Sequence, residues 1–304
     1  MNALVLSSLL PVVLVVALGF GVGRLAWVSP EGMRDLSRLT FLVLTPAFLF
    51  RTMATVHPEQ LDFLPVLGYF AGVMLLFMGV LMVHGLHPRS VVLALTCTFS
   101  NTTMIGIPLI SLAYGQAGLV VLLTLVSVHA LVLLTTGTLI LELAAQGRSS
   151  LRSLLRAVRG AVVHPIPLPI LLGLAFAQTG MALPAVLDKP LQWIGGAFSP
   201  MALLLVGMTL AQRPARAHWN TAVVLVMAKN LLLPLLVAVA AWLLDVDALH
   251  RTVIVVAAAL PVGANVLLFS QRYQVGEAEV TAAVALSTLL ALATVSLTMY
   301  LLPY

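Results

Sequence analysis

Long apolar segments recur along the whole sequence, and each is long enough to cross a membrane. Residues 3–23, ALVLSSLLPVVLVVALGFGVG, are the first such segment, and about 20 helical residues span roughly 30 Å of hydrocarbon. Only 8% of the 304 residues are charged and 61% are hydrophobic, whereas a soluble domain has about 25% charged residues. Too few charges exist to cover a soluble core, so we expect an all-α polytopic membrane protein.

Charged and turn-forming residues divide the chain into ten segments that we expect to be transmembrane helices. These segments are residues 3–23, 36–54, 61–83, 90–113, 117–143, 163–180, 190–212, 219–244, 249–271 and 278–302. The first lacks a basic start and exceeds the length of a signal-peptide core, so we interpret it as a spanning helix. A basic linker, residues 146–162, separates a first half (1–145) from a second half (163–304), each with five helices.

The basic residues indicate the orientation in the membrane, because Lys and Arg are enriched in cytoplasmic loops. Alternate loops on one side hold three basic residues, Arg51, Lys189 and Arg251. Loops on the other side hold eleven, namely Arg24, Arg34, Arg38, Arg89, Arg148, Arg152, Arg156, Arg159, Arg213, Arg216 and Arg272. We expect both termini to be non-cytoplasmic and the chain to lie in the cell (inner) membrane. The net charge of +5 follows this topology and does not indicate nucleic-acid binding.

The two halves are interrupted at corresponding positions. The fourth predicted helix contains SNTTMIGIP, with Gly106 and Pro108, and the ninth contains LPVGANVLLFS, with Pro261 and Gly263. Five helices per half place the second half upside down relative to the first, which predicts an inverted repeat. Interrupted helices at matching positions of two repeats indicate a binding site near the membrane midplane.

Polar residues at these interruptions are candidates for substrate binding. Unwound backbone at membrane depth must face protein or a wet cavity, and helix N-termini offer N–H groups to an anion. An asparagine amide both donates and accepts hydrogen bonds. The candidate binding residues are Ser100, Asn101, Thr102, Gly263 and Asn265. A proline-kinked helix whose hydroxyl groups only cap freed carbonyls is the alternative interpretation.

Two ionisable residues, Lys229 and His129, are expected at membrane depth, where a charge costs about 2.5 kcal/mol or more. Lys229 could contact an anion, act as a fixed cation at helix C-termini, or simply meet backbone carbonyls. His129 could relay protons or form a neutral hydrogen bond between helices. No Asp or Glu is expected at this depth, which argues against a metal site; Glu277 and Glu279 are expected to be solvated loop charges.

Enzyme motifs are absent from the sequence. It contains no HExxH, no GxSxG and no phosphate-binding P-loop, so we predict no catalytic residues and no cofactor. Coupling of transport to H⁺ or Na⁺ stays open at this level.

The motifs NTTMIGIPLI and AALPVGANVLLFSQRYQVGEAEVTAAVALSTLLALATVSL resemble those of the auxin efflux carrier family. This family includes the plant PIN auxin exporters and bacterial carboxylate-transporter homologues. Asn101, Gly106 and Pro108 match its helix 4 motif, and Pro261 and Gly263 match its helix 9 motif. The plant carriers have a second proline where Val266 stands here, and many have a long cytoplasmic loop that this chain lacks.

The resemblance implies a fold like that of bile-acid symporters and sodium/proton antiporters, with helices 4 and 9 crossing at the midplane. It implies a scaffold domain from predicted helices 1, 2, 6 and 7, and a transport domain from helices 3–5 and 8–10. It also implies a homodimer and elevator-type alternating access.

The sequence therefore predicts a secondary transporter of a small organic anion, either a carboxylate or an auxin-like molecule. A sodium-coupled bile-acid-type symporter is the second interpretation, and it requires sodium ligands that the sequence does not identify. A membrane-embedded enzyme or receptor is a third interpretation, from a different class. Dependence of uptake on sodium distinguishes the first two.

Overall fold

The computed structural model describes residues 3–56, 61–146, 166–211, 219–263 and 265–302. These residues are almost entirely helical, and their β-structure is an isolated bridge between Ser100 and Val262. The first half contains α1 (Ala3–Arg24), α2 (Pro30–Leu39), η1 (Thr40–Leu44), α3 (Thr45–Ala54), α4 (Leu64–His84), α5 (Pro88–Thr98), η3 (Thr102–Gly106) and α6 (Ile107–Gln146). The second half contains α8 (Pro167–Ala177), α9 (Ala185–Gly196), α10 (Phe198–Ala211), α11 (Trp219–Met227), η4 (Ala228–Leu232), α12 (Leu233–Leu243), α13 (Ala248–Ala259), α14 (Asn265–Tyr273) and α15 (Glu277–Leu301).

Several of the described helical stretches are long and apolar enough to cross a membrane. The five that are continuous are Pro30–Ala54, Leu64–His84, Thr102–His129, Ala185–Ala211 and Trp219–Leu243. The bent α15 makes a sixth if its two parts form one span. Shorter apolar helices lie at Leu10–Arg24, Pro167–Ala177 and Ala248–Ala259. The described residues thus have the helices expected of a multi-pass membrane protein.

In the described part of the chain, three helices contain a π-helical turn that the apolar pattern does not reveal. In each case a proline follows two residues after the turn: Pro46 follows η1, Pro108 follows η3 and Pro234 follows η4. A proline has no N–H to donate to the preceding turn, and a wider turn accommodates the missing hydrogen bond. The backbone N–H that follows each turn donates five residues back, as Ile107 does to Thr102 O. The prolines therefore produce local widening and leave the helix continuous.

This corrects the expected position of the interruption in the fourth predicted helix. The helix ends at Thr98 and resumes at Thr102, so the unwound residues are 99–101. Gly106 and Pro108, which we expected to break the helix, lie in the helical segment after the interruption. The glycine closes the π-turn, and the proline lies at the second residue of α6, where the widened turn tolerates it.

The fourth and fifth predicted helices run together as α6, which bends at Gly115. This residue has φ 60° and ψ −152°, a conformation outside the helical region. Glycine reaches positive φ at little steric cost because it has no Cβ. One glycine thus replaces the loop expected between residues 113 and 117.

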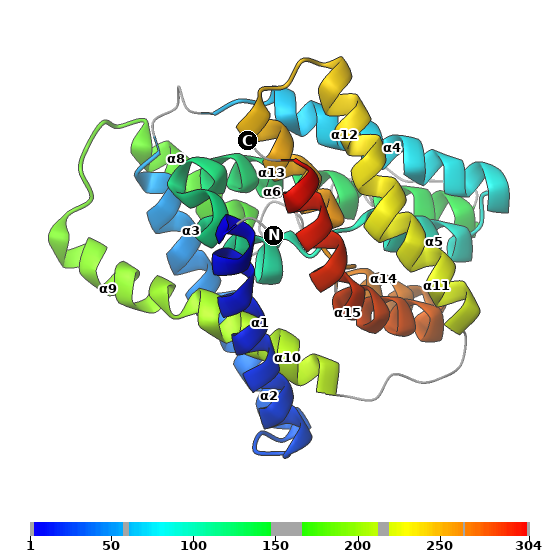
Figure 1. Cartoon of the computed structure of the whole chain (residues 1–304), viewed down its shortest axis with the longest axis horizontal. Helices are drawn as coiled ribbons and strands as arrows, with labels where there is room; N and C mark the ends of the chain where they lie inside the picture. The colour runs from blue at the N-terminus through cyan, green and yellow to red at the C-terminus, as the bar shows by residue number, and fades with distance from the viewer. Residues whose placement is uncertain (1–2, 57–60, 147–165, 212–218, 264, 303–304) are drawn as a thin grey trace.

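The helices form two groups around a centre that contains α6 and α13 (Figure 1). On one side α1 packs against α10, and α3 packs against α8 and α9. On the other side α4 packs against α12, and α11 packs against α15. Glycines allow these close approaches: a Cβ on Gly207 of α10 would lie 2.0 Å from Val16 O of α1, and one on Gly72 of α4 would lie 2.7 Å from Val237 Cγ2 of α12.

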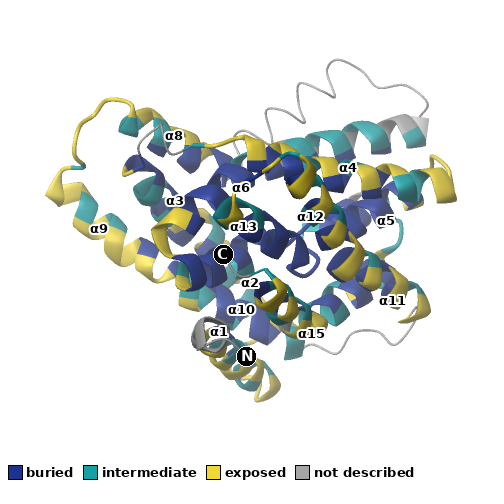
Figure 2. Cartoon of the chain, turned by 45° about the horizontal axis from the view of Figure 1, so that its top comes forward, coloured by how far each residue is buried: buried dark blue, intermediate teal, exposed yellow. Residues whose placement is uncertain are grey.

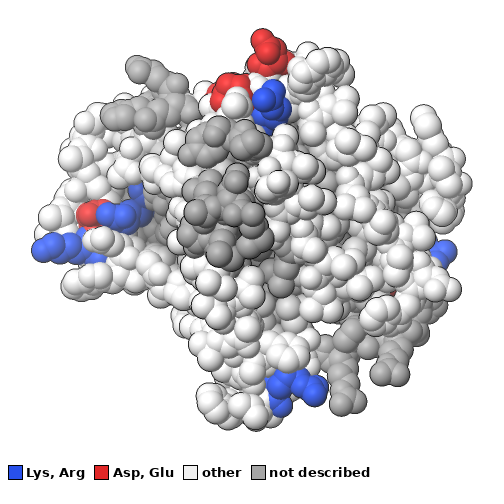
Figure 3. Space-filling view, in the orientation of Figure 1, with Lys and Arg blue, Asp and Glu red and all other residues white. Residues whose placement is uncertain are grey.

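The outer surface is apolar, as expected of a protein that faces lipid. Buried residues line the inside of both groups, whereas the outward faces of α1, α4, α9 and α11 are exposed (Figure 2). Most of the visible surface carries no charge, and the charged side chains gather in a few patches near its edges (Figure 3). The exposed large apolar side chains include Leu14, Leu18, Leu75, Met82, Val186, Trp193, Val224 and Trp242. Contact with lipid tails removes these apolar side chains from water, which is favourable.

Among the described residues, two ion pairs join helices that are distant in the sequence. Arg51 of α3 makes a two-pronged contact with Asp188 of α9, with Nε 2.7 Å from Oδ1. Arg89 at the start of α5 bonds Glu279 at the start of α15, at 3.0 Å. Only 7% of Glu279 is exposed. The expectation of a solvated loop charge is therefore wrong for Glu279, because the fold brings α5 over it, whereas Glu277 is exposed.

Candidate functional site

The two interrupted helices meet where their backbones are extended. Ser100 and Val262 form an antiparallel bridge. Asn101 N donates to Pro261 O at 2.9 Å, and Gly263 N donates to Phe99 O at 2.8 Å. Each interruption thus satisfies backbone groups of the other, which is required of unwound chain that is buried in an apolar molecule.

Glycines permit this close crossing. A Cβ on Gly263 would lie 2.8 Å from Phe99 Cδ1 and 3.2 Å from Ser100 O. A Cβ on Gly106 would lie 2.8 Å from Leu260 Cδ1. Both distances to carbon are shorter than van der Waals contact allows. The two glycines that the motifs single out therefore maintain the crossing of the two segments.

The last helix also supports the crossing through Ser287. Its hydroxyl oxygen accepts a hydrogen bond from Val262 N at 3.0 Å, and its carbonyl oxygen accepts one from Asn230 Nδ2 at 3.2 Å. Both Ser287 and Asn230 are buried. Sequence reasoning did not identify Ser287, because a single serine in an apolar helix is common and carries no local signal.

Helices begin directly after each interruption. Asn101 caps the first of them, since its Oδ1 accepts a hydrogen bond from Met104 N at 3.2 Å. Thr103 lies in the first turn, where backbone N–H groups have no partner within the helix. Asn265 is the first residue of α14. Both helix N-termini carry a partial positive charge, and both face the space beside the crossing.

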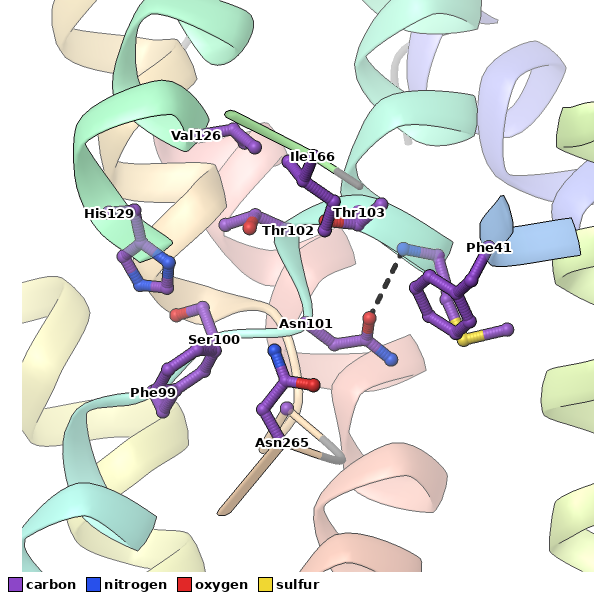
Figure 4. Close-up of a pocket in the computed structure, with 12 residues that line it drawn as sticks. Phe41, Phe99, Ser100, Asn101, Thr102, Thr103, Val126, His129, Ile166 and Asn265 are labelled. Atoms are coloured by element: carbon purple, nitrogen blue, oxygen red, sulfur yellow. Dashed lines mark hydrogen bonds between the residues drawn. The ribbon is translucent and has the colours of Figure 1, made fainter. Parts of the chain in front are cut away.

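That space is a cavity with an empty volume of about 430 Å³, part of which is open to the outside. Figure 4 shows the Asn265 side chain directed from the start of α14 toward the Ser100–Asn101 segment. The lining residues are Phe41, Phe99, Ser100, Asn101, Thr102, Thr103, Met104, Val126, His129, Ile166, Gly263 and Asn265.

All five candidate binding residues, and His129, thus lie together around one cavity. Gly106, Pro108, Pro261 and Lys229 are not among its lining residues. Their positions are at the crossing itself or behind it. Thr103 and Met104 belong to the same motif as Asn101 and could have been included on that basis. Phe41 and Ile166 come from other helices and could not.

His129 is held by two aromatic neighbours. Tyr69 Oη lies 3.3 Å from His129 Nε2 and donates a hydrogen bond to Ser100 Oγ at 3.1 Å. The Phe99 and His129 rings pack edge to face, with centroids 4.8 Å apart. Tyr69, His129 and Ser100 are all buried. This geometry matches a hydrogen-bonding residue between α4, α6 and the crossing; the proton relay stays a prediction.

Lys229 is fully buried and lies behind the crossing. Its Nζ donates to Ala258 O at 2.6 Å and to Leu260 O at 2.7 Å. Ala258 lies in the last turn of α13, and Leu260 is the C-cap residue that follows the helix. Of the alternatives considered for Lys229, the structure shows the contact with carbonyls at a helix end. The ammonium group is not among the groups that line the cavity.

Among the described residues, Asp62, Asp247 and His250 could offer three ligand atoms to a metal, within 4.8 Å of one another. The Asp247 carboxylate also contacts the His250 ring, and Asp247 caps the start of α13. This group lies at the opposite end of α13 from the crossing. Exposed carboxylates of this kind are common without a metal, so we assign no metal site here.

Comparison with known proteins identifies the family. The family described as "Membrane transport protein" matches residues 4–299. The chain is 26% identical to the "Putative malonate transporter" of Rhizobium meliloti, over 96% of this chain and 94% of that protein. It is 24% identical to "Uncharacterized transporter YfdV" of Escherichia coli, over 93% of each. It is 22% identical to "Auxin efflux carrier component 8" of Arabidopsis thaliana, over 95% of each.

These relatives are named as transporters and not as enzymes, and they match almost end to end. The resemblance that the two interrupted motifs indicate is confirmed. The chain is a membrane transporter, and it belongs to the membrane transport protein family of the auxin efflux carriers.

Proposed function

We propose that this protein is a secondary transporter of a small organic anion, either a carboxylate or an auxin-like molecule. The observation that carries the proposal is the cavity beside the crossing, onto which two helix N-termini and two asparagine side chains converge. Partial positive charge and free N–H groups at helix N-termini favour an anion. The names of two relatives, for malonate and auxin transport, agree with this chemistry.

The hydrogen bonds around the cavity favour donation to a ligand. Asn101 Oδ1 already accepts from Met104 N, which leaves the amide hydrogens of Asn101 to donate. Ser100 Oγ accepts from Tyr69, so the Ser100 hydroxyl hydrogen is available to a ligand. Carboxylates are acceptors only, and donors held in place by other hydrogen bonds suit them. Asn265 and Thr102 complete the proposed binding site. Gly263 also belongs to it, because its lack of a side chain lets the Phe99–Ser100 backbone approach closely.

We further propose ten spans arranged as two inverted five-helix repeats, with elevator-type movement. The scaffold domain comprises α1–α3 and α8–α10, and the transport domain comprises α4–α6 and α11–α15. The close packing within each group supports this division. So does an apolar cavity between α1, α10, α6 and α15, with an empty volume of about 480 Å³, part of which is open to the outside. A junction lined by apolar side chains allows one group to slide past the other. A homodimer in the cell membrane completes this proposal.

A sodium-coupled symporter is the alternative mechanism. Sodium requires oxygen ligands, and the carbonyls of Ala258 and Leu260 at the end of α13 are suitable ones. Both accept hydrogen bonds from the Lys229 ammonium group, which favours transport without sodium at that position.

Uptake into proteoliposomes tests the function. Labelled malonate, malate, other small carboxylates and indole-3-acetate are offered with and without Na⁺ and H⁺ gradients. We expect saturable uptake of at least one anion. Asn101→Ala should abolish it, and Asn101→Asp should do the same, because aspartate keeps the cap on Met104 N but replaces the amide donor with a negative charge.

Asn220→Ala is the matched control, since Asn220 is an exposed asparagine at the start of α11. Its uptake should equal that of the unmodified protein. Unimpaired uptake by Asn101→Asp would overturn the assignment of the site. No uptake of any anion under any gradient would overturn the proposed substrate class.

A further inference from the structure

The side-chain nitrogen of Lys229 contacts the carbonyl end of α13. A helix C-terminus exposes carbonyl groups without intrahelical partners and carries a partial negative charge. In α13 this end is buried at the crossing, beyond the reach of bulk water. Lys229 Nζ lies 2.6 Å from Ala258 O and 2.7 Å from Leu260 O. Distances this short are typical of charge-assisted hydrogen bonds.

The same arrangement of oxygens is one that a free cation can occupy. Backbone carbonyls replace the hydration shell of monovalent cations, and helix C-terminal ends in transporters coordinate such ions. The two carbonyl oxygens converge on one point, because both lie within hydrogen-bonding distance of the same nitrogen atom, Lys229 Nζ. The ammonium group of Lys229 is at that point.

Lys229 lies in the π-turn η4. Lys229 is the second residue of the turn Ala228–Leu232, whose widened geometry precedes Pro234. Lys229 and its neighbour Asn230 are both buried. Asn230 donates to the Ser287 carbonyl, so adjacent residues of one turn hold α13 and α15.

We propose that the carbonyl end of α13 is a monovalent-cation site whose permanent occupant is the ammonium group of Lys229. The chain thereby carries its own positive charge at the crossing, and a dissolved cation is not needed there. The assignment of the cation site does not depend on the proposed function. Its consequence for transport does: we expect anion transport that does not require Na⁺ or K⁺ at this site.

Chemical complementation tests the site without measuring transport. Lys229→Ala keeps Cβ and removes the remaining three methylenes and the amine, a fragment that propylammonium matches. One sample is purified and then thermally unfolded with propylammonium chloride present throughout. A parallel sample contains 1-propanol, a neutral molecule of the same size, in its place. We expect the melting temperature of Lys229→Ala to fall below that of the unmodified protein and to be restored, saturably, by propylammonium alone.

Lys229→Met is the matched control, because methionine fills the space of the lysine stem but carries no charge. It should be destabilised and should not respond to propylammonium. A methionine variant with the unmodified melting temperature, or an alanine variant that 1-propanol restores equally, would overturn the proposal, because either result indicates a purely space-filling role.

If Lys229→Ala cannot be purified with or without the amine, the melting temperature of Lys229→Met decides. A value below that of the unmodified protein supports the proposal, and an equal value overturns it. In the transport assay, Lys229→Ala should acquire a requirement for Na⁺ or K⁺ that the unmodified protein lacks. Because the melting experiment needs no substrate, the cation site and the proposed anion transport can fail independently.

Discussion

Individual residues at the crossing form hydrogen bonds through their backbone groups as well as through their side chains. Asn101 both pairs with the other interruption through its N–H and caps the following helix through its side chain. Gly263 brings its N–H to Phe99 O and leaves no room for a Cβ. Residues that serve the backbone in this way tolerate substitution less well than neighbours of similar polarity, because two segments depend on each of them.

Gly263→Ala should lower both stability and uptake. The new Cβ would lie 3.2 Å from Ser100 O, and this backbone atom cannot move away without breaking the pairing of the two segments. We expect a loss of about 1–3 kcal/mol in the free energy of unfolding, as for other overpacked sites. Thermal melting in detergent and proteoliposome uptake measure the two effects.

Gly79→Ala is its control. Gly79 lies in α4, and a Cβ there would meet no atom within 4 Å. This substitution should be neutral or slightly stabilising, because alanine has a higher helix propensity than glycine. Equal effects of the two substitutions would contradict the close-crossing argument.

Helices in this protein are divided into shorter units that meet at defined points. Among the described helices, the proline-linked π-turns locally widen three, and the extended segments at residues 99–101 and 260–263 interrupt two. Such short units depend on contacts between helices, since helices of about 10 residues are marginal by themselves. The Arg89–Glu279 pair is one of these contacts, joining the first turns of α5 and α15.

Arg89→Ala should destabilise the protein by about 1 kcal/mol or more, because Glu279 is buried and loses a charged hydrogen-bond donor. The control is Arg34→Ala, which removes the exposed pair between Arg34 and Glu31 within α2. Exposed pairs of this kind contribute little, so its melting temperature should be unchanged. Comparable losses in both variants would show that the burial of Glu279 is unimportant.

At the scale of the whole molecule, two helix groups pack around a centre that contains α6 and α13. The crossing belongs to the proposed transport domain, because α5, α6, α13 and α14 all lie in it. The proposed topology places both chain ends on the non-cytoplasmic side and the basic linker inside. The distribution of arginines supports this orientation. The direction in which the cavity opens during transport depends on it.

Fusions to reporter enzymes test this topology. Alkaline phosphatase fused after Tyr304 should be active, because the enzyme folds only outside the cytoplasm. Green fluorescent protein at the same position should be dark. Within the linker, residues 146–162, the two reporters should behave in the opposite way. A fluorescent C-terminal fusion would contradict the proposed orientation.

Much of the candidate site is predictable from local patterns. Long apolar segments require membrane-spanning helices, because buried backbone must satisfy its own hydrogen bonds in lipid. Asn101, Gly106, Pro261, Gly263 and Asn265 stand out because polar or helix-breaking residues in an apolar segment are costly and need a reason. They fall at corresponding positions of the two predicted halves, and the structure brings the two interrupted segments together at the crossing.

Other features depend on which surfaces the folded chain brings together. The sequence suggests that Pro108 ends a helix, yet a π-turn accommodates this proline and the interruption lies at residues 99–101. Glu279 looks like a loop charge, yet α5 buries it. Phe41 and Ile166 give no local sign that they line the cavity.

Lys229 shows most clearly where sequence and tertiary structure divide. Its presence in an apolar segment indicates that a buried positive charge needs a partner, because an isolated charge in that environment is too costly. The sequence does not identify the partner, since the carbonyls of Ala258 and Leu260 lie about thirty residues later. Hydropathy and motifs are local properties and determine the helices and their interruptions. Contacts between distant segments depend on three-dimensional packing, and only the tertiary structure decided them.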